Sequence, residues 1–512
     1  MSRPALAADG ARGHSITRNT AFAFLAQLTG AAFTGFLTIF LARKLGTNGY
    51  GVLSLALGIA GLALLPSDFG VSNSVGRFVA EHRHDVARIE QLVADGFRLK
   101  LVASVVIAGL LIALAGPIAD GYGLPGLVWP IRGVAIALFA QNLMMLGVVF
   151  APIGRLDLQL WTALTESAVE TTACVALVLA GAGATGAAFG RAIGYLAGAL
   201  ATIYLLARSI GPAIVPRSYR FGPDARRIAG YASVLLVIDG AYTAFTQVDV
   251  LIVGAYLSAS AVGIFGAPMR LITFLAYPGL AVSSAVAPRL ARGSPDGPNV
   301  AAFMTALRLL LVVQAAITAF VLGWAGLLSK VVLGSGYAES ATVLRALAPF
   351  VFLSGFGTIV SVGANYLGEA ARRVPVAIAT ALLNLVIDLV LVPKVGVVGG
   401  AIGTDVAFGL YAPAHLLICQ RSLQLDLRPT ALTFVRGLLA GAALTGALLL
   451  FGDSPSQLWR LPAGALTGLG AFALVLLATR ELTVAEARLL LARVNPAGWL
   501  ARRSRADEKT VR

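Results

Sequence analysis

The chain has little of what soluble enzymes rely on. Only 12% of its residues are charged, against roughly 25% in soluble proteins, and it contains two cysteines and four histidines. Cys174 and Cys419 fall within apolar runs, so we expect no disulfide framework and no metal-ligand cluster. The phosphate-binding motif G-x-x-x-x-G-K-[ST] is also missing. We therefore expect no metal, no cofactor and no ATPase domain in this chain.

Long apolar runs dominate instead. Hydrophobic residues make up 58% of the 512 residues. A membrane helix needs roughly 20 apolar residues to cross about 30 Å of hydrocarbon, which gives about fourteen candidate spans. They lie near residues 19–42, 49–67, 96–116, 127–152, 159–181, 186–207, 229–256, 261–287, 303–328, 341–367, 374–393, 397–419, 431–451 and 461–479.

The basic residues indicate how the chain lies in the membrane. Lys and Arg number 39 against 24 Asp and Glu, a net charge of +15, and they concentrate in the N-terminal segment, the even connections and the C-terminal tail. The positive-inside bias then predicts that both termini are cytoplasmic. Because these residues flank apolar runs and form no base-reading motif, anionic lipids are the expected partner, and nucleic acid is not.

Two parts of the chain read as copies of each other, about 212 residues apart. Residues 45–77 and 257–289 share leucine, glycine and arginine at matched positions, and residues 183–190 and 396–403 share a glycine pattern. A membrane chain built from two repeats is typical of transporters in which two halves move about a central path. The matched residues are Leu45, Gly51 and Arg77 with Leu257, Gly263 and Arg289.

Two motifs resemble a known family. The run from Ala42 to Gly51, continuing through Asp68-Phe-Gly70, resembles the first two helices of bacterial polysaccharide flippases, and Val253 to Phe265 resembles the connection between their seventh and eighth helices. These flippases belong to the multidrug, oligosaccharidyl-lipid and polysaccharide (MOP) exporter superfamily. The likeness spans residues from about 15 to about 480.

The resemblance implies an all-α polytopic fold with two parallel six-helix lobes and two further helices. On this basis we expect a cytoplasmic segment 1–18, an N-lobe 19–209, a linker 210–228, a C-lobe 229–420, a final helix pair 431–480 and a basic cytoplasmic tail 481–512. In flippases with fourteen helices the last pair is thought to cradle the lipid tail. Small residues let membrane helices approach, so Gly437, Gly441, Gly464 and Gly468 would bring this pair together.

The same resemblance implies a function. The family exports undecaprenyl-diphosphate-linked oligosaccharide from the cytoplasmic to the periplasmic leaflet for cell-surface polysaccharide, by alternating access, beside polysaccharide polymerases and glycosyltransferases. Three alternatives remain: a multidrug exporter of the same superfamily, a membrane glycosyltransferase or polymerase, and a non-transporting scaffold. The intramembrane arginines and the expected helix pair count against the first, and the lack of a soluble catalytic domain counts against the second.

Charges within apolar spans are costly unless paired or facing a polar cavity, so they point to the site. Arg270 lies near the expected midplane of the eighth span, and we expect it to face the cavity and attract the diphosphate, with Asp249 holding it when substrate is absent. Arg191 and Arg132 are further candidates for the cavity wall. A structural ion pair and snorkelling to the membrane surface are the alternatives.

Several carboxylates are candidates for ion pairing or for coupling to an ion gradient or the membrane potential. Glu166 and Glu170 lie one turn apart on one helical face, where they would bind Arg191 or carry a coupling proton. Asp239 and Asp405 are further candidates, and Asp388 is expected nearer an outer end. The amides of Asn365 and Asn384 would bind sugar hydroxyls or a neighbouring helix.

Two segments have the pattern of helices that lie on the membrane. Residues 77–93 place apolar side chains on one face, and Thr483 with Glu486 resembles a capping box that opens a helix through Arg493. Trp499 and the arginines that follow would anchor the tail to acidic lipid.

Overall fold

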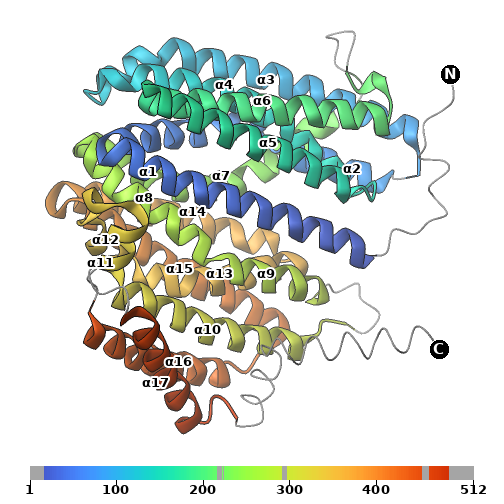
Figure 1. Ribbon diagram of the computed structural model, residues 1–512. Helices are drawn as coiled ribbons and strands as arrows, with labels where there is room; N and C mark the ends of the chain where they lie inside the picture. Colours follow the sequence, from blue (N-terminus) through green and yellow to red (C-terminus); the bar gives the residue numbers. More distant parts are fainter. Residues whose placement is uncertain are drawn as a thin grey trace, which may run out of the picture.

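A computed structural model describes residues 16–82, 84–215, 222, 224–290, 297–452 and 460–483, and this part of the chain consists of helices and short connections (Figure 1). The helices are α1 (Ile16–Asp68), α2 (Val71–Glu81), α3 (Val86–Gly121), α4 (Val128–Met144), α5 (Leu156–Leu177), α6 (Gly183–Ser209), α7 (Ala225–Tyr256), α8 (Ala259–Leu275), α9 (Tyr277–Val286), α10 (Val300–Gly323), α11 (Ala325–Leu327), α12 (Ser340–Ala346), α13 (Ala348–Tyr366), α14 (Ala370–Val395), α15 (Val397–Leu423), α16 (Arg428–Phe451) and α17 (Leu461–Ala478).

Eleven helical segments in the described ranges are long and apolar enough to cross a membrane. Two of these segments each cover two predicted spans. In both, the helical run continues on either side of a glycine that breaks the helix geometry. In α1 the break is at Gly46, where φ is +65°, and between α5 and α6 it is at Gly181, where φ is +89°. Glycine adopts this left-handed backbone without steric cost, so both turns are made by the residue type that permits them. The all-α membrane fold is confirmed, while the count of fourteen spans, the domain limits and the orientation stay predictions.

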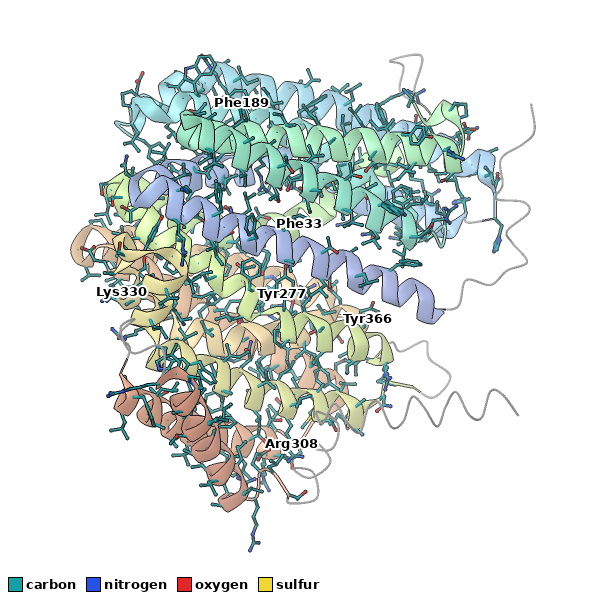
Figure 2. All side chains as sticks on the ribbon, viewed as in Figure 1. Phe33, Phe189, Tyr277, Arg308, Lys330 and Tyr366 are labelled. Carbon is teal, nitrogen blue, oxygen red and sulfur yellow. The ribbon has the colours of Figure 1, made fainter. Side chains whose placement is uncertain are left out.

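Helices α1–α6, which we call the first half, lie above α8–α15 in the view of Figure 1, with α16 and α17 at the lower edge. We call α7–α15 the second half. Lys330 and Tyr366 mark the two opposite ends of the bundle (Figure 2). Below, these are the Lys330 end and the Tyr366 end.

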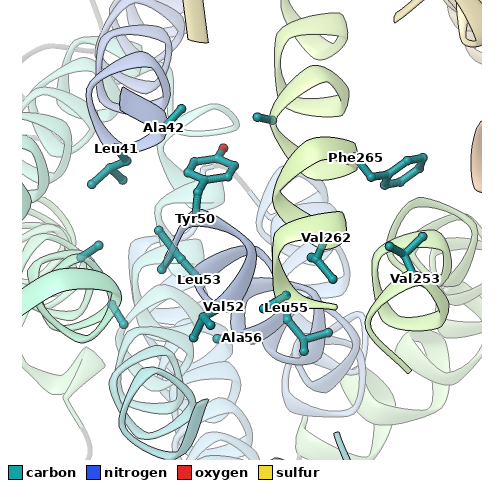
Figure 3. Close-up of a cluster of buried hydrophobic side chains, with 14 of the residues drawn as sticks. Leu41, Ala42, Tyr50, Val52, Leu53, Leu55, Ala56, Val253, Val262 and Phe265 are labelled. Atoms are coloured by element: carbon teal, nitrogen blue, oxygen red, sulfur yellow. The ribbon is translucent and has the colours of Figure 1, made fainter. Parts of the chain in front are cut away.

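The two halves share one hydrophobic core near the Lys330 end. Side chains of α1 pack there against α7 and α8 (Figure 3). Leu55, Val253, Val262 and Phe265 are completely buried. Burying a large apolar side chain stabilises by roughly 1.5–3 kcal/mol relative to exposing it to water, although in a membrane close packing carries more of this gain. This core holds the halves together at one end.

The amphipathic segment predicted over residues 77–93 is not one helix. Helix α2 ends at Glu81, and α3 begins at Val86 with the Asp85 side chain accepting a hydrogen bond from the Arg88 N–H at 3.1 Å. The apolar residues Phe78, Ile89 and Val93 are buried in a protein core rather than laid on lipid. The predicted apolar face is buried except at Val86, which is exposed, and the Asp85 cap starts a new helix there. The predicted tail helix from Thr483 to Arg493, with Trp499, extends outside the described residues.

Small residues join α16 to the second half and α17 to α16. Gly437 and Gly441 face Ala315 of α10, so the prediction that they bring α16 and α17 together was wrong. Gly464 and Gly468 do border α16, against Phe451 and Leu444 respectively. One pair of glycines thus joins α16 to α10, and the other joins α17 to α16.

An ion cluster fixes this accessory pair to α10. Glu481, which follows α17, is buried and accepts hydrogen bonds from Arg308 at 2.7 Å, Arg436 at 3.0 Å and Thr433 at 2.8 Å. Arg308, labelled in Figure 2, is thus held in an ion pair instead of extending alone to the membrane surface.

Candidate substrate and ion sites between the two halves

The first repeat and the second repeat contact each other at the Lys330 end. A side chain at Gly51 would collide with the carbonyl of Ala259, and one at Gly263 would collide with the carbonyl of Thr47. The hydroxyls of Thr47 and Ser260 are 2.7 Å apart. Because α1 and α8 meet backbone to backbone, this end is closed.

Polar bonds across the same end reinforce the closure. The Arg43 guanidinium of α1 donates to the carbonyls of Val331 and Val332, the latter at 3.0 Å. The buried Tyr337 hydroxyl donates toward the Ala42 and Gly46 carbonyls at 3.2 and 3.0 Å. A helix break leaves carbonyls without helical partners, and these side chains satisfy them.

Arg270 of α8 lines two cavities between the halves. The larger has a volume of about 340 Å³ and is also lined by Ser54, Gln247 and Asp249, while the smaller, about 50 Å³, includes Tyr50 and Arg191. The Arg270 side chain is exposed, and within the described part of the chain it has no ion-pair or hydrogen-bond partner. The expected pairing of Arg270 with Asp249 is therefore contradicted. Its guanidinium remains available to an anion.

Asp249 belongs to a buried polar cluster in the second half. It accepts hydrogen bonds from Thr404 Oγ1 at 2.6 Å and from Asn384 Nδ2, and the same amide lies 3.1 Å from Asp388 Oδ2. Asp249, Asn384 and Asp388 are at most 1% exposed, and Asn384 Oδ1 and Asp388 Oδ1 lack a hydrogen-bond partner among the described residues. Asp388 thus lies beside Asp249, a pairing that depth along the helices did not predict. The cluster has acceptor oxygens but no cationic side chain among the described residues.

The first half has a cationic counterpart. Arg191 of α6 lies 2.7 Å from Glu170 Oε1 of α5 and 2.9 Å from the Tyr195 hydroxyl, with its guanidinium also 4.9 Å from the Tyr195 ring centroid. The predicted binding of Arg191 by this carboxylate pair is thus present for Glu170, and Glu166 lies one turn away, accepting from Ser167 at 2.9 Å. Whether these groups bind substrate or couple an ion stays a prediction.

Three glycines of α6 let α5, which carries these carboxylates, lie close against α6. A Cβ at Gly190 would lie 2.6 Å from the Cys174 Cα, one at Gly194 would lie 2.6 Å from the Glu170 Cα, and one at Gly198 would lie 2.8 Å from the Glu166 Cβ. Glycine at every fourth position lets α6 approach α5 closely, as small residues do in membranes. The spacing of these glycines is visible in the sequence, where it signals a close helix contact as well as a repeat.

The residue that follows the repeated glycine pattern differs between the two copies. Arg191 follows Gly190, and Thr404 follows Gly403 at the matched place in the second copy. In the first half this position holds a cation, and in the second half it holds a hydroxyl that binds a carboxylate. The two halves therefore differ in chemistry at this matched position.

The remaining predicted residues lie elsewhere. Asp405 Oδ1 accepts a hydrogen bond from the Phe350 N–H at 2.9 Å, which gives it a local structural partner. The Arg132 guanidinium lies 4.7 Å from the exposed Trp129 ring and lines neither Arg270 cavity. Asp239 is on α7, and its side chain is outside the described part.

One buried cluster was not predicted. Lys100, which the sequence places only among the basic residues that flank the membrane, is completely buried in α3, where it pairs with Asp68 and donates to Asn142 Oδ1 at 2.6 Å. Asp68 also accepts from Ser72 at 2.6 Å, just before the left-handed turn at Phe69 and Gly70. The Asp68-Phe-Gly70 motif thus ties the end of α1 to α2, α3 and α4.

Comparisons with solved structures place this fold. The chain is similar to the lipid II flippase MurJ in an inward closed conformation, with a TM-score of 0.71 at 14% identity over 89% of this chain and 98% of that one. It is also similar to the eukaryotic MATE transporter AtDTX14, with a TM-score of 0.59 at 16% identity over 82% and 99% of the two chains. These likenesses, together with the eleven long apolar helical segments of the described ranges, show a multi-pass membrane protein with the MOP-type fold.

Sequence comparisons give the family. Residues 40–342 match the family described as polysaccharide biosynthesis protein, and the chain belongs to it. A protein named as a low-salt glycan biosynthesis flippase, Agl15 of Haloferax volcanii, is 23% identical over 407 residues, covering 78% of this chain and 82% of that one. A protein of Shigella flexneri named as an O-antigen transporter is 24% identical over 401 residues, covering 72% and 88%.

Proposed function

We propose that this transporter flips an undecaprenyl-diphosphate-linked oligosaccharide from the cytoplasmic to the outer leaflet for cell-surface polysaccharide. The observation that carries the proposal is Arg270, a guanidinium without a partner in the described residues, facing a cavity of about 340 Å³ between the halves. An unpaired arginine within the membrane is costly unless it serves a ligand, and its planar fork matches phosphate oxygens. The flippase and transporter names of the two relatives support the same substrate class.

The direction of transport follows from the proposed topology. With both termini cytoplasmic, the Lys330 end faces the periplasm, and the contacts of Gly51 and Gly263 close it. The cavity then loads from the cytoplasm, where lipid-linked glycans are made, and empties when α1 and α8 separate. The basic connections at the Tyr366 end would lie against anionic lipid, near the glycosyltransferases and polymerase that make and use the substrate.

We propose that ion coupling, if the substrate moves with an ion, uses the buried carboxylates of the second half. Asp249, Asp388, the Asn384 carbonyl and the Thr404 hydroxyl offer oxygens of the kind that bind Na⁺, and either carboxylate would take a proton instead. Asn384 Oδ1 and Asp388 Oδ1 are both buried without a described partner, which favours an added cation or proton there. Because Asp249 also lines the Arg270 cavity, the bound ion and the substrate would sense each other.

A multidrug exporter is the less favoured alternative. Organic cations would be repelled by the unpaired Arg270 in the larger cavity, and only its Asp249 edge is acidic. An anionic diphosphate would instead be attracted by the Arg270 guanidinium.

The experiment is the leaflet distribution of lipid-linked glycan in depleted cells, read with a membrane-impermeant sugar-labelling reagent. We expect the glycan to accumulate on the cytoplasmic leaflet, with rescue by wild type and not by Arg270→Ala. A normal distribution in depleted cells would reject the proposal, and so would full rescue by Arg270→Ala.

A further inference from the structure

A third cavity, of about 230 Å³, lies beside the Arg270 cavity on the side of the Tyr366 end. Its lining includes Tyr242, Thr358, Ser361, Arg373 and Tyr411. Tyr242, Thr358 and Phe408 line both this cavity and the one at Arg270, so the two cavities adjoin. A ligand held by its diphosphate at Arg270 would have its next chemical group in this space.

Arg373 of α14 is held at this cavity by neutral acceptors. Its guanidinium donates to Ser361 Oγ at 2.8 Å, to His415 Nε2 at 3.3 Å and to Asn365 Oδ1. His415 Nδ1 lies 2.8 Å from the Tyr411 carbonyl and must donate to it, so Nε2 is the acceptor and the imidazole is neutral. No carboxylate pairs with Arg373 among the described residues, and a guanidinium has five donors, of which three are used. Its positive charge is fixed in place and uncompensated.

The walls beside Arg373 are aromatic and carry hydroxyls. Tyr411 stacks on Phe408 with ring centroids 5.1 Å apart and lies 6.3 Å from Tyr242, which is 49% exposed. The Tyr411 hydroxyl is 2.8 Å from Ser361 Oγ. An aromatic ring with a polar edge suits a ligand that is apolar on its faces and polar at its rim, as a sugar ring is.

We propose that this cavity binds an acidic sugar of the transported glycan, with Arg373 pairing its carboxylate and the exposed Tyr242 ring packing on the sugar. The inference rests on the proposed function, because it places the diphosphate at Arg270 and the glycan beyond it. Arg373 would bind an anion, and the substrate has two: a sugar carboxylate and the diphosphate itself. The aromatic walls favour the sugar, since a diphosphate has no apolar face to pack on them.

Saturation-transfer NMR on the full chain in nanodiscs tests this with three probes: methyl β-D-glucuronide, methyl β-D-glucoside and inorganic pyrophosphate, the last followed by its ³¹P line width. We expect wild type to transfer saturation to the ring protons of the glucuronide more strongly than to those of the glucoside. Arg373→Gln should weaken glucuronide binding by about tenfold or more, the effect of losing a charge-assisted hydrogen bond. Arg373→Lys, which keeps the charge, should retain part of it.

Arg372→Gln is the matched control, because Arg372 is exposed and pairs with Glu369 at 3.3 Å. It should leave glucuronide binding unchanged. Equal binding of the two glycosides by wild type, or equal loss in Arg372→Gln and Arg373→Gln, would overturn the proposal. Loss of pyrophosphate binding in Arg373→Gln would also overturn the proposal, because it would assign this cavity to the diphosphate.

Arg270→Gln separates this inference from the proposed function. It should abolish pyrophosphate binding and leave glucuronide binding intact. Pyrophosphate binding that survives Arg270→Gln would contradict the diphosphate site without touching the sugar site. A fall in the melting temperature of Arg373→Gln with wild-type glucuronide affinity would assign Arg373 to holding α13, α14 and α15 together, and would overturn the sugar site.

Discussion

Gly51 and Gly263, at matched positions of the two repeats, each pack against the backbone of the other repeat. Gly51 meets the Ala259 carbonyl and Gly263 meets the Thr47 carbonyl, and Thr47 and Ala259 are themselves matched at the same spacing of about 212 residues. The contact is thus reciprocal, like the self-complementary interface of a two-fold dimer. Packed elements of this kind switch between discrete arrangements, which suits a gate.

Adding a methyl group at this contact should open the gate. Gly263→Ala places a Cβ on the Thr47 carbonyl, which moves only if α1 and α8 separate. We expect a cysteine at Ser260, tested in a Cys174→Ala, Cys419→Ala background, to react faster with an impermeant maleimide in this variant. Gly409→Ala is the control, because a Cβ there meets nothing within 4 Å. Unchanged labelling in Gly263→Ala would show that this contact is not the gate.

Removing Arg191 should destabilise the first half. Its loss leaves Glu170 and Glu166 buried without their cation, and breaking a buried pair on one side costs about 3–5 kcal/mol. We expect a lower melting temperature for Arg191→Ala in detergent, and partial recovery in Arg191→Ala with Glu170→Gln. Equal melting of wild type and the single variant would show that the pair contributes nothing to stability.

The Glu481 cluster should respond to pH in one direction. Burial raises the pKa of Glu481, but the hydrogen bonds from Arg308, Thr433 and Arg436 outweigh this and hold the pKa below its ordinary value of 4.5. A depressed pKa stabilises the folded protein above about pH 4.5, and this contribution disappears as pH falls through the folded pKa.

Glu481→Gln should therefore lower the melting temperature at pH 7, and the difference from wild type should shrink toward pH 4. A difference that stays constant over this range would mean that the carboxylate charge is not what attaches α16 and α17.

The sequence predicted features that depend on neighbouring residues, and it did not predict those that depend on partners far along the chain. Apolar runs predicted the helices, because the length of an apolar run acts locally. The partners of Asp249 and Arg308 were not predictable, since Asn384 is 135 residues away and Glu481 is 173 residues away. Depth along a helix gives only candidate pairs, and the rotation of each helix decides among them.

Neutralising the acidic cluster should change the ion dependence of transport. Asp388→Asn removes a buried carboxylate beside Asp249, so we expect flipping in vesicles to lose its response to a Na⁺ or H⁺ gradient. Asp120→Asn, an exposed carboxylate near the end of α3, should keep it. If wild type shows no response to either gradient, or if Asp388→Asn keeps the wild-type response, the cluster is not the coupling site.

The most direct measurement is flipping by the purified protein in vesicles that carry a fluorescent undecaprenyl-diphosphate-linked sugar, with an impermeant quencher outside. The account predicts that wild type exposes the inner-leaflet lipid to the quencher, that Arg270→Ala leaves it protected, and that Arg421→Ala, at the exposed end of α15, behaves as wild type. Protection in wild-type vesicles, or quenching through Arg270→Ala at the wild-type rate, would contradict the account.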